Sequence, residues 1–440
     1  MLAPSSAQKF LSYLAGWLTL TGWQASCASG AFNSGLLIQG LITLCNPGYT
    51  PTGWRTTLLA WAILLFAVLI NTGATNSLAK FEGLILILHI VGFFAILIPI
   101  TYLGPQGSSA DVFNTWVDGG NWSSQGYAFF IGLVGPVYAF VGGDSAAHVA
   151  EEVKDAARIV PRAIFISVAL NGALGFGMLI ATLFAMGDPA TTGQEILGTE
   201  LGFPFIQLFL NSTNSVAGAA VMASIVLILG ISSTVGLLAS SSRMFWSFSR
   251  DRGLPFWKTI SKVNSRTSIP VVAVITTTTI SALLSLIGIG SSIAFNDIIS
   301  ITVVGLYSSY LLALVLLFWR RITGAIHDSW SDTLPSEPIN THHGQLVWGP
   351  FRLPKMIGAI VNAIAIAYLC IVFIFSFWPP AQPVTAATMN YACLVFGATL
   401  LFSVVWYFAY ARRTYEGPVI DIEVLEAYSS SPSGKASMLK

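Results

Sequence analysis

The sequence has few charged residues. Its 440 residues include 20 Lys or Arg and 19 Asp or Glu, which together make up 9% of the chain. Soluble domains carry about 25% charged residues, so this chain has too few to cover the surface of a water-soluble globule. The scarcity excludes a soluble enzyme and a disordered chain. The formal net charge of +1 gives no reason to expect nucleic acid as a partner.

The sequence also lacks the motifs of catalysis and metal binding. Its four cysteines form no CxxC pair and no metal-ligand spacing, which excludes a disulfide-rich secreted scaffold. The five histidines supply no HExxH motif and no histidine box, which argues against a membrane metalloenzyme. No Walker A loop is present, so ATP hydrolysis is not the expected energy source. We therefore expect no enzymatic activity, no cofactor and no metal, and a secondary transporter remains as the default.

Apolar residues are abundant, at 54% of the chain, and the mean hydropathy is +0.73. They form blocks of about 20 residues, the length that crosses the hydrocarbon core of a bilayer. Each block must be helical, because lipid offers the backbone no hydrogen-bond partner. We predict an all-α polytopic membrane protein of about ten transmembrane helices. The expected spans are residues 10–43, 55–73, 81–103, 127–149, 163–186, 216–240, 270–288, 294–319, 355–378 and 390–411.

The basic residues predict the orientation in the membrane. If the N-terminus is cytoplasmic, the inner loops hold 19 of the 20 Lys and Arg residues, and only Arg55 lies outside. The sequons at Asn121 and Asn211 both fall in the outer loops, where glycosylation occurs. We expect both termini to be cytoplasmic, in the plasma membrane or in a vacuolar or other internal membrane. Residues 1–410 then form the transmembrane bundle, and 411–440, rich in Ser, Pro and Gly near the end, form a disordered cytoplasmic tail.

The fourth span, residues 127–149, has an unusual composition for a helix. Pro136 removes one backbone hydrogen bond, and the pair Gly142–Gly143 lowers helix stability by about 1 kcal/mol per residue. These residues predict a break around 140–142, near the middle of the membrane. Broken backbone at that depth either lines a cavity and binds a small solute or is a kink that only shapes packing. Asp144 follows the break, where it either binds solute or caps the next helix.

Three other polar side chains lie within predicted spans. His89 is about 12 Å deep at 1.5 Å per residue, and it either exchanges a proton near physiological pH or is a neutral histidine bonded to a neighbouring helix. Gln24 faces either a cavity or a neighbouring helix. Ser232 either satisfies kinked backbone or touches solute. Small residues such as Gly22 provide a face for close helix packing in the first span.

Two segments resemble a known family. Residues 140–162 read FVGGDSAAHVAEEVKDAARIVPR, which resembles the segment after the broken sixth helix of fungal amino acid and choline permeases. These permeases belong to the amino acid–polyamine–organocation (APC) superfamily. Residues 242–255 read SRMFWSFSRDRGLP, which is similar to the loop after that superfamily's eighth helix, and VNSRTSIP at 263–270 continues the match. The resemblance extends to about Glu416.

The resemblance implies a leucine-transporter-like fold of two inverted repeats. It also implies uptake of amino acids, GABA, choline or related amines across the lipid bilayer, usually driven by protons. By position, His89 matches a lysine that replaces a coupling sodium ion in some relatives, so it is the expected proton-coupling residue. The substrate-binding residues that the resemblance implies are Tyr138 as aromatic gate, Phe140, Val141 and Gly142 as unwound segment, Asp144 as the carboxylate beyond it, and Gln24, Ser232 and Tyr307 facing the central site.

The sequence departs from the family pattern in one respect. Its broken helix is the fourth span, whereas the family's is the sixth, so we expect the first two helices and part of the first repeat to be missing. We expect one of two causes for the missing helices. Either the start codon has been placed too far downstream, or the chain is a truncated product. A truncated bundle would be unstable or inactive. The alternatives are a choline or polyamine carrier of the same fold and a truncated, non-transporting receptor or regulatory relative.

Overall fold

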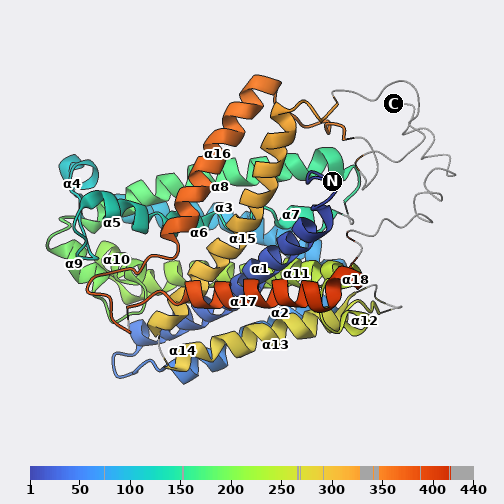
Figure 1. Cartoon of the computed structure of the whole chain (residues 1–440). Helices are drawn as coiled ribbons and strands as arrows, with labels where there is room; N and C mark the ends of the chain where they lie inside the picture. The colour runs from blue at the N-terminus through green and yellow to red at the C-terminus, as the bar shows by residue number, and fades with distance from the viewer. Residues whose placement is uncertain are drawn as a thin grey trace.

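The computed structural model (Figure 1) describes most of the chain. The described residues are 1–73, 75–150, 153–264, 267, 269–290, 292–327, 340, 346–386, 388–415 and 417. Most of the expected C-terminal tail, residues 418–440, lies outside them. Within the described residues the chain is helical, with an isolated bridge between His327 and Val347 as its only β-pairing. The prediction of an all-α polytopic membrane protein is confirmed.

Nine segments of the described chain are long and apolar enough to cross a membrane. The helices on which they are built are α1 (Gln8–Cys45), α2 (Gly53–Gly73), α3 (Thr75–Leu103), α8 (Ala156–Met186), α11 (Val216–Arg250), α13 (Val271–Ser285), α15 (Ser292–Ile322), α16 (Lys355–Phe375) and α17 (Ala392–Trp406). A short helix, α14 (Ile287–Gly290), continues α13. The π-helix η2 (Tyr407–Ala411) and α18 (Arg412–Thr414) continue α17.

The remaining expected span, residues 127–149, is divided into three short helices, α5 (Gln125–Gly132), α6 (Val134–Ala139) and α7 (Ser145–His148). Residues 140–144 between α6 and α7 are not helical, which confirms the predicted break. A further interruption at Leu133 was not predicted. Its physical cause is Pro136, whose ring conflicts with the carbonyl of Gly132 one turn earlier.

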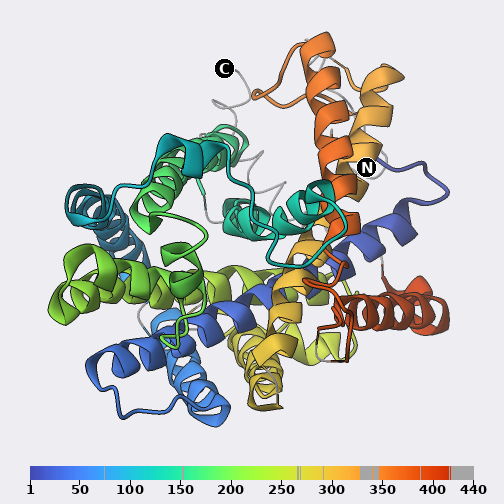
Figure 2. The same cartoon turned by 90° about the vertical axis from the view of Figure 1, so that its left-hand side faces the viewer.

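Helix α1 runs through the middle of the bundle (Figure 2), where it packs against α2, α11, α13 and α15. At 1.5 Å per residue its 38 residues extend about 57 Å, against a hydrocarbon core of ~30 Å. The first span is therefore too long for an upright helix. Such a helix either tilts or projects beyond the bilayer.

The short connecting helices gather at two opposite ends of the bundle (Figure 1). At one end lie α4 (Ser109–Phe113), α9 (Thr192–Leu197) and α10 (Pro204–Thr213), all from loops expected on the outside. At the other end lie the N-terminus, α12 (Trp257–Ile260) and α18 (Arg412–Thr414). This division follows from the order of the predicted spans.

Helices α1 and α15 cross with their backbones in close approach. A Cβ atom added at Gly305 would lie 2.6 Å from the backbone nitrogen of Gly22, and one added at Gly22 would lie 2.7 Å from the backbone nitrogen of Leu306. Only glycine fits at both positions, because real Cβ contacts do not become so short. The small-residue face expected on the first span is therefore a helix-crossing site.

Candidate functional site

A cavity of about 740 Å³ borders the broken span. Its walls come from α1, α3, α11 and the segment that contains the break. The lining residues used below are Trp23, Glu82, His89, Val141, Gly142, Ser232 and Arg243. The cavity therefore combines two intramembrane ionisable side chains with non-helical backbone, the two features that mark solute pathways in membrane proteins.

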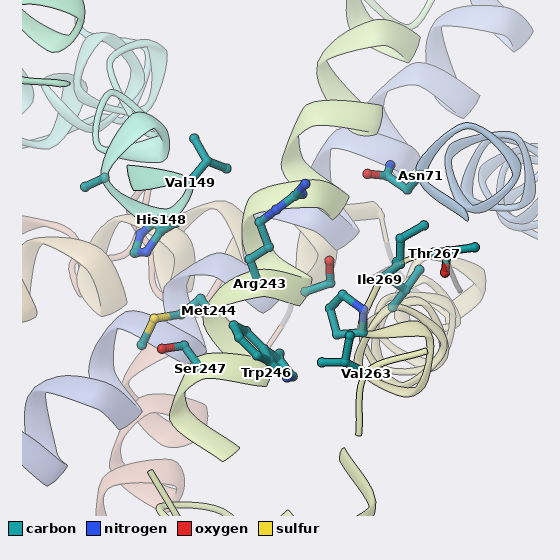
Figure 3. Close-up of a pocket in the computed structure, with 14 residues that line it drawn as sticks. Asn71, His148, Val149, Arg243, Met244, Trp246, Ser247, Val263, Thr267 and Ile269 are labelled. Carbon is teal, nitrogen blue, oxygen red and sulfur yellow. The ribbon is translucent and has the colours of Figure 1, made fainter. Parts of the chain in front are cut away.

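A second cavity of about 570 Å³ adjoins the first, since Val149 and Arg243 line both. In Figure 3, Arg243 of α11 lies between His148 and Val149 on one side and Asn71 on the other. Residues between α12 and α13, such as Thr267, also line this cavity. The two cavities together therefore connect the break with the α12 end of the bundle, which is the end expected in the cytoplasm.

The break provides free backbone groups next to the first cavity. Gly142 has φ +87°, a left-handed conformation that glycine adopts without a steric penalty. Among the described residues, the amides of Gly142 and Gly143 have no backbone acceptor, whereas the amide of Ser145 donates to the carbonyl of Gly142 at 3.0 Å. Free amides beside a cavity are suited to bind an anionic group of a solute.

Asp144 pairs with His148 beyond the break. Its Oδ2 lies 3.1 Å from the Nε2 of His148, and its Oδ1 is buried without a hydrogen-bond partner among the described residues. The residue precedes α7, but its side chain makes no capping hydrogen bond. The alternative that Asp144 caps the following helix is therefore wrong. Its carboxylate bonds a side chain one turn along instead of the helix amides.

Trp23 joins the cavity to the packed interior. Its indole meets the ring of His148 edge-on, with the centroids 5.2 Å apart. A Cβ atom added at Gly142 would lie 3.8 Å from the same indole. Trp23 also belongs to a buried cluster that contains Leu306 and Tyr307. It thus contacts both the break and α15, so a movement of either element changes the shape of the cavity wall.

The structure brings four of the nine sequence-predicted site residues to the 740 Å³ cavity, namely His89, Val141, Gly142 and Ser232. The other five are not among its described lining residues. Tyr138 shares a hydrogen bond of 2.8 Å with Ser29 of α1, and Tyr307 packs in the cluster with Trp23.

Phe140 and Gln24 contact neighbouring helices instead of lining the cavity. The ring of Phe140 is 3.5 Å from the position of a Cβ added at Gly172 of α8. The side-chain amide of Gln24 donates to Thr277 Oγ1 of α13 at 3.2 Å. The sequence left two orientations open for Gln24, toward a cavity or toward a neighbouring helix. In the structure it faces the neighbouring helix. Gln24 therefore connects α1 to α13 in this conformation.

Sequence reasoning missed Trp23, Glu82 and Arg243 as cavity residues. A signal was present for Glu82, because it lies seven positions before His89 and a seven-residue spacing places both on one helix face. Arg243 was counted only among the basic residues of an inner loop, although α11 continues to Arg250. No signal marked Trp23, since tryptophan is common in apolar spans.

Comparisons with known proteins agree with this architecture. Residues 2–399 match the family described as amino acid permease. The chain is 30% identical to a Macrophomina phaseolina protein named as an amino acid/polyamine transporter, over 89% of this chain and 82% of the relative. It is 26% identical to the choline transporter of Saccharomyces cerevisiae, over 92% of this chain and 68% of the relative. It is 27% identical to amino-acid permease BAT1 of Arabidopsis thaliana, over 96% of this chain and 80% of the relative.

Proposed function

The chain belongs to the amino acid permease family, and from this premise we propose that it carries amino acids, GABA or related amines across a membrane by secondary active transport. The observation that carries the proposal is the non-helical segment at residues 140–144, whose Gly142 lines an intramembrane cavity. Backbone of this kind is stable within a bilayer only where protein or a water-filled cavity satisfies it. Alternating access would expose the segment to each side of the membrane in turn.

The groups at the cavity fit a zwitterionic solute. The amides of Gly142 and Gly143 at the break suit a carboxylate, and the carboxylate of Glu82 in the cavity wall suits an ammonium group. Asp144, which pairs with His148, lies beyond the lining residues. We expect a host that lacks its own permeases to take up labelled amino acids or GABA when it expresses this chain. Absence of uptake, with the chain correctly inserted in the membrane, would contradict the proposal and favour a non-transporting relative.

A choline or polyamine carrier is the second candidate. Glu82 lines the cavity, and a carboxylate binds the ammonium groups of organic cations. Competition distinguishes the two candidates. If excess choline or spermidine blocks uptake and amino acids do not, the substrate is a cation without a carboxylate.

We further propose that His89 couples transport to protons. Replacing His89 with alanine is expected to remove the increase in uptake that the unaltered protein shows when the external solution becomes more acidic. A histidine in the cavity binds a proton at low external pH and releases it at the higher internal pH, and alanine does neither. The measurement is initial uptake rate against external pH. His327→Ala is the matched control, because His327 is outside both cavities; an unchanged pH profile for His89→Ala would reject the assignment.

We propose that both termini lie in the cytoplasm and that the chain resides in the plasma membrane. Glycosylation tests the orientation. Asn121 is exposed between α4 and α5, whereas Asn211 is half-buried within α10, where its side chain accepts a hydrogen bond from Gln207 at 2.8 Å. We expect a glycan at Asn121 alone, so that Asn121→Gln, but not Asn211→Gln, increases electrophoretic mobility as much as glycosidase treatment does. A glycan-free protein from a secretory-competent host would count against this orientation.

A further inference from the structure

A basic cavity lies apart from the site described above. It has a volume of about 420 Å³ and is placed where α15 ends and α16 begins. Arg321, Arg352 and Lys355 line it together with Trp348, and none of its described lining residues is acidic. Arg321 and Lys355 bring two positive charges to one cavity, and an anionic group between them would reduce their mutual repulsion.

Arg321 is held rigidly in this cavity. Its side chain is only 8% exposed, and its guanidinium lies 4.3 Å from the ring centroid of Trp348. On another side it packs directly against Gly358 of α16, where any Cβ atom would overlap Arg321 Nη1. Nη1 donates to the carbonyl of Leu353 at 3.4 Å, but the buried Nε has no hydrogen-bond partner among the described residues. A buried, fixed donor of this kind can bind an anionic group that enters the cavity.

The N-terminus of α16 adds further donors. This helix of 21 residues begins at Lys355, and its N-cap residue, Pro354, provides no side-chain hydrogen bond. The amide of Gly358 is the first to pair within the helix, with the carbonyl of Pro354 at 2.7 Å. The preceding amides therefore remain available beside Lys355, at the positive end of the helix dipole. Phosphate oxygens are well suited to such a site.

The surroundings of the cavity favour a lipid phosphate over a soluble one. Apolar side chains on the first turns of α16 are exposed, with Met356 75%, Ile357 53% and Ile360 56% exposed. This exposed apolar face continues from the basic cavity toward the middle of the membrane and includes Ile364, which is 64% exposed. A lipid would place its headgroup in the cavity and its acyl chains along this face. Because α16 is a candidate membrane span, bilayer lipids lie against this face and their headgroups are next to the cavity.

We propose that this cavity binds the phosphate headgroup of an anionic membrane lipid. Basic pockets between transmembrane helices at a bilayer surface bind such headgroups. Arg321 provides the fixed donor, Arg352 and Lys355 provide charge, and the α16 amides complete the site. The proposal depends on membrane insertion alone and not on the transported substrate, so either proposal can fail without the other.

The test measures lipid binding to the purified full-length chain in detergent. The probes are short-chain phosphatidylinositol phosphate, the matching free inositol phosphate, and phosphatidylcholine of the same chain length. We expect phosphatidylinositol phosphate to bind and to raise the thermal unfolding temperature. The double variant Arg352→Gln/Lys355→Gln should weaken binding about tenfold or more, because each cation near an anionic headgroup contributes to affinity.

The matched control is Arg412→Gln/Arg413→Gln, which removes two exposed basic residues at the same end of the bundle. Equal loss in both double variants would overturn the proposal, since the effect would be general charge attraction. Equal binding of free inositol phosphate would overturn the lipid assignment in favour of a soluble phosphate. If the double variant does not fold, the single variant Lys355→Gln replaces it, because this side chain is exposed and its loss should not prevent folding. Unchanged lipid affinity in Lys355→Gln would also overturn the proposal.

Discussion

Replacement of Gly305 by leucine is expected to prevent stable folding and to lower the free energy of unfolding by about 3 kcal/mol or more. Helices α1 and α15 touch backbone to backbone at this point, since a Cβ atom at Gly305 would lie 2.6 Å from the nitrogen of Gly22. A backbone atom cannot move aside as a flexible side chain does, so the two helices must separate along their length. The measurement is thermal unfolding and size-exclusion elution of the detergent-solubilised protein.

Gly397→Leu is the matched control for this variant. Gly397 lies in α17, is exposed, and has no heavy atom within 4 Å of an added Cβ. The same substitution there adds an apolar side chain that faces lipid and raises helix propensity. If Gly305→Leu unfolds at the same temperature as Gly397→Leu, the close crossing of α1 and α15 does not exist in the protein.

Substituting alanine for Gly142 is expected to reduce uptake about tenfold or more while leaving the protein in the membrane. At φ +87° an L-residue is strained by about 1–3 kcal/mol, and each 1.4 kcal/mol corresponds to a factor of ten in an equilibrium. The strain acts on residues 140–144, where we propose that substrate binds. Relief of the strain would rotate the amides of Gly142 and Gly143 away from the cavity. Initial uptake rates, normalised to surface protein, measure the effect.

Gly132→Ala is the control for the Gly142 variant. Gly132 ends α5 in the same span, and an added Cβ there meets no heavy atom within 4 Å. Alanine is the better helix former, so uptake by this variant should match that of the unaltered protein. Full uptake by Gly142→Ala would show that transport does not depend on the conformation of the break.

Features encoded by local chemistry were predictable from the sequence. Span positions follow from hydropathy alone, because the bilayer fixes the length of each helix. The break at residues 140–144 follows from Pro136 and the two glycines after it, whose effects on a helix do not depend on its neighbours. The interruption at Leu133 has the same cause, and its position one turn before the proline is a local effect as well.

Features that depend on helix neighbours were not predictable. Gln24 bonds Thr277 across 253 residues of sequence, and nothing in either segment specifies that pairing. The cavity itself exists only because α3 and α11 pack at a particular distance from the break. Its lining residues therefore become known only with the fold.

The central position of α1 affects how the protein is made. Of the nine candidate spans it is the least apolar and the most buried, because small and polar residues face its neighbours. Its main partners, α11 and α15, are synthesised some two to three hundred residues later. A helix of low hydrophobicity partitions weakly from the translocon into lipid by itself. Until α15 has been synthesised, the polar and small-residue face of α1 therefore lacks two of its native partners, and α2 is the first helix that can cover part of it.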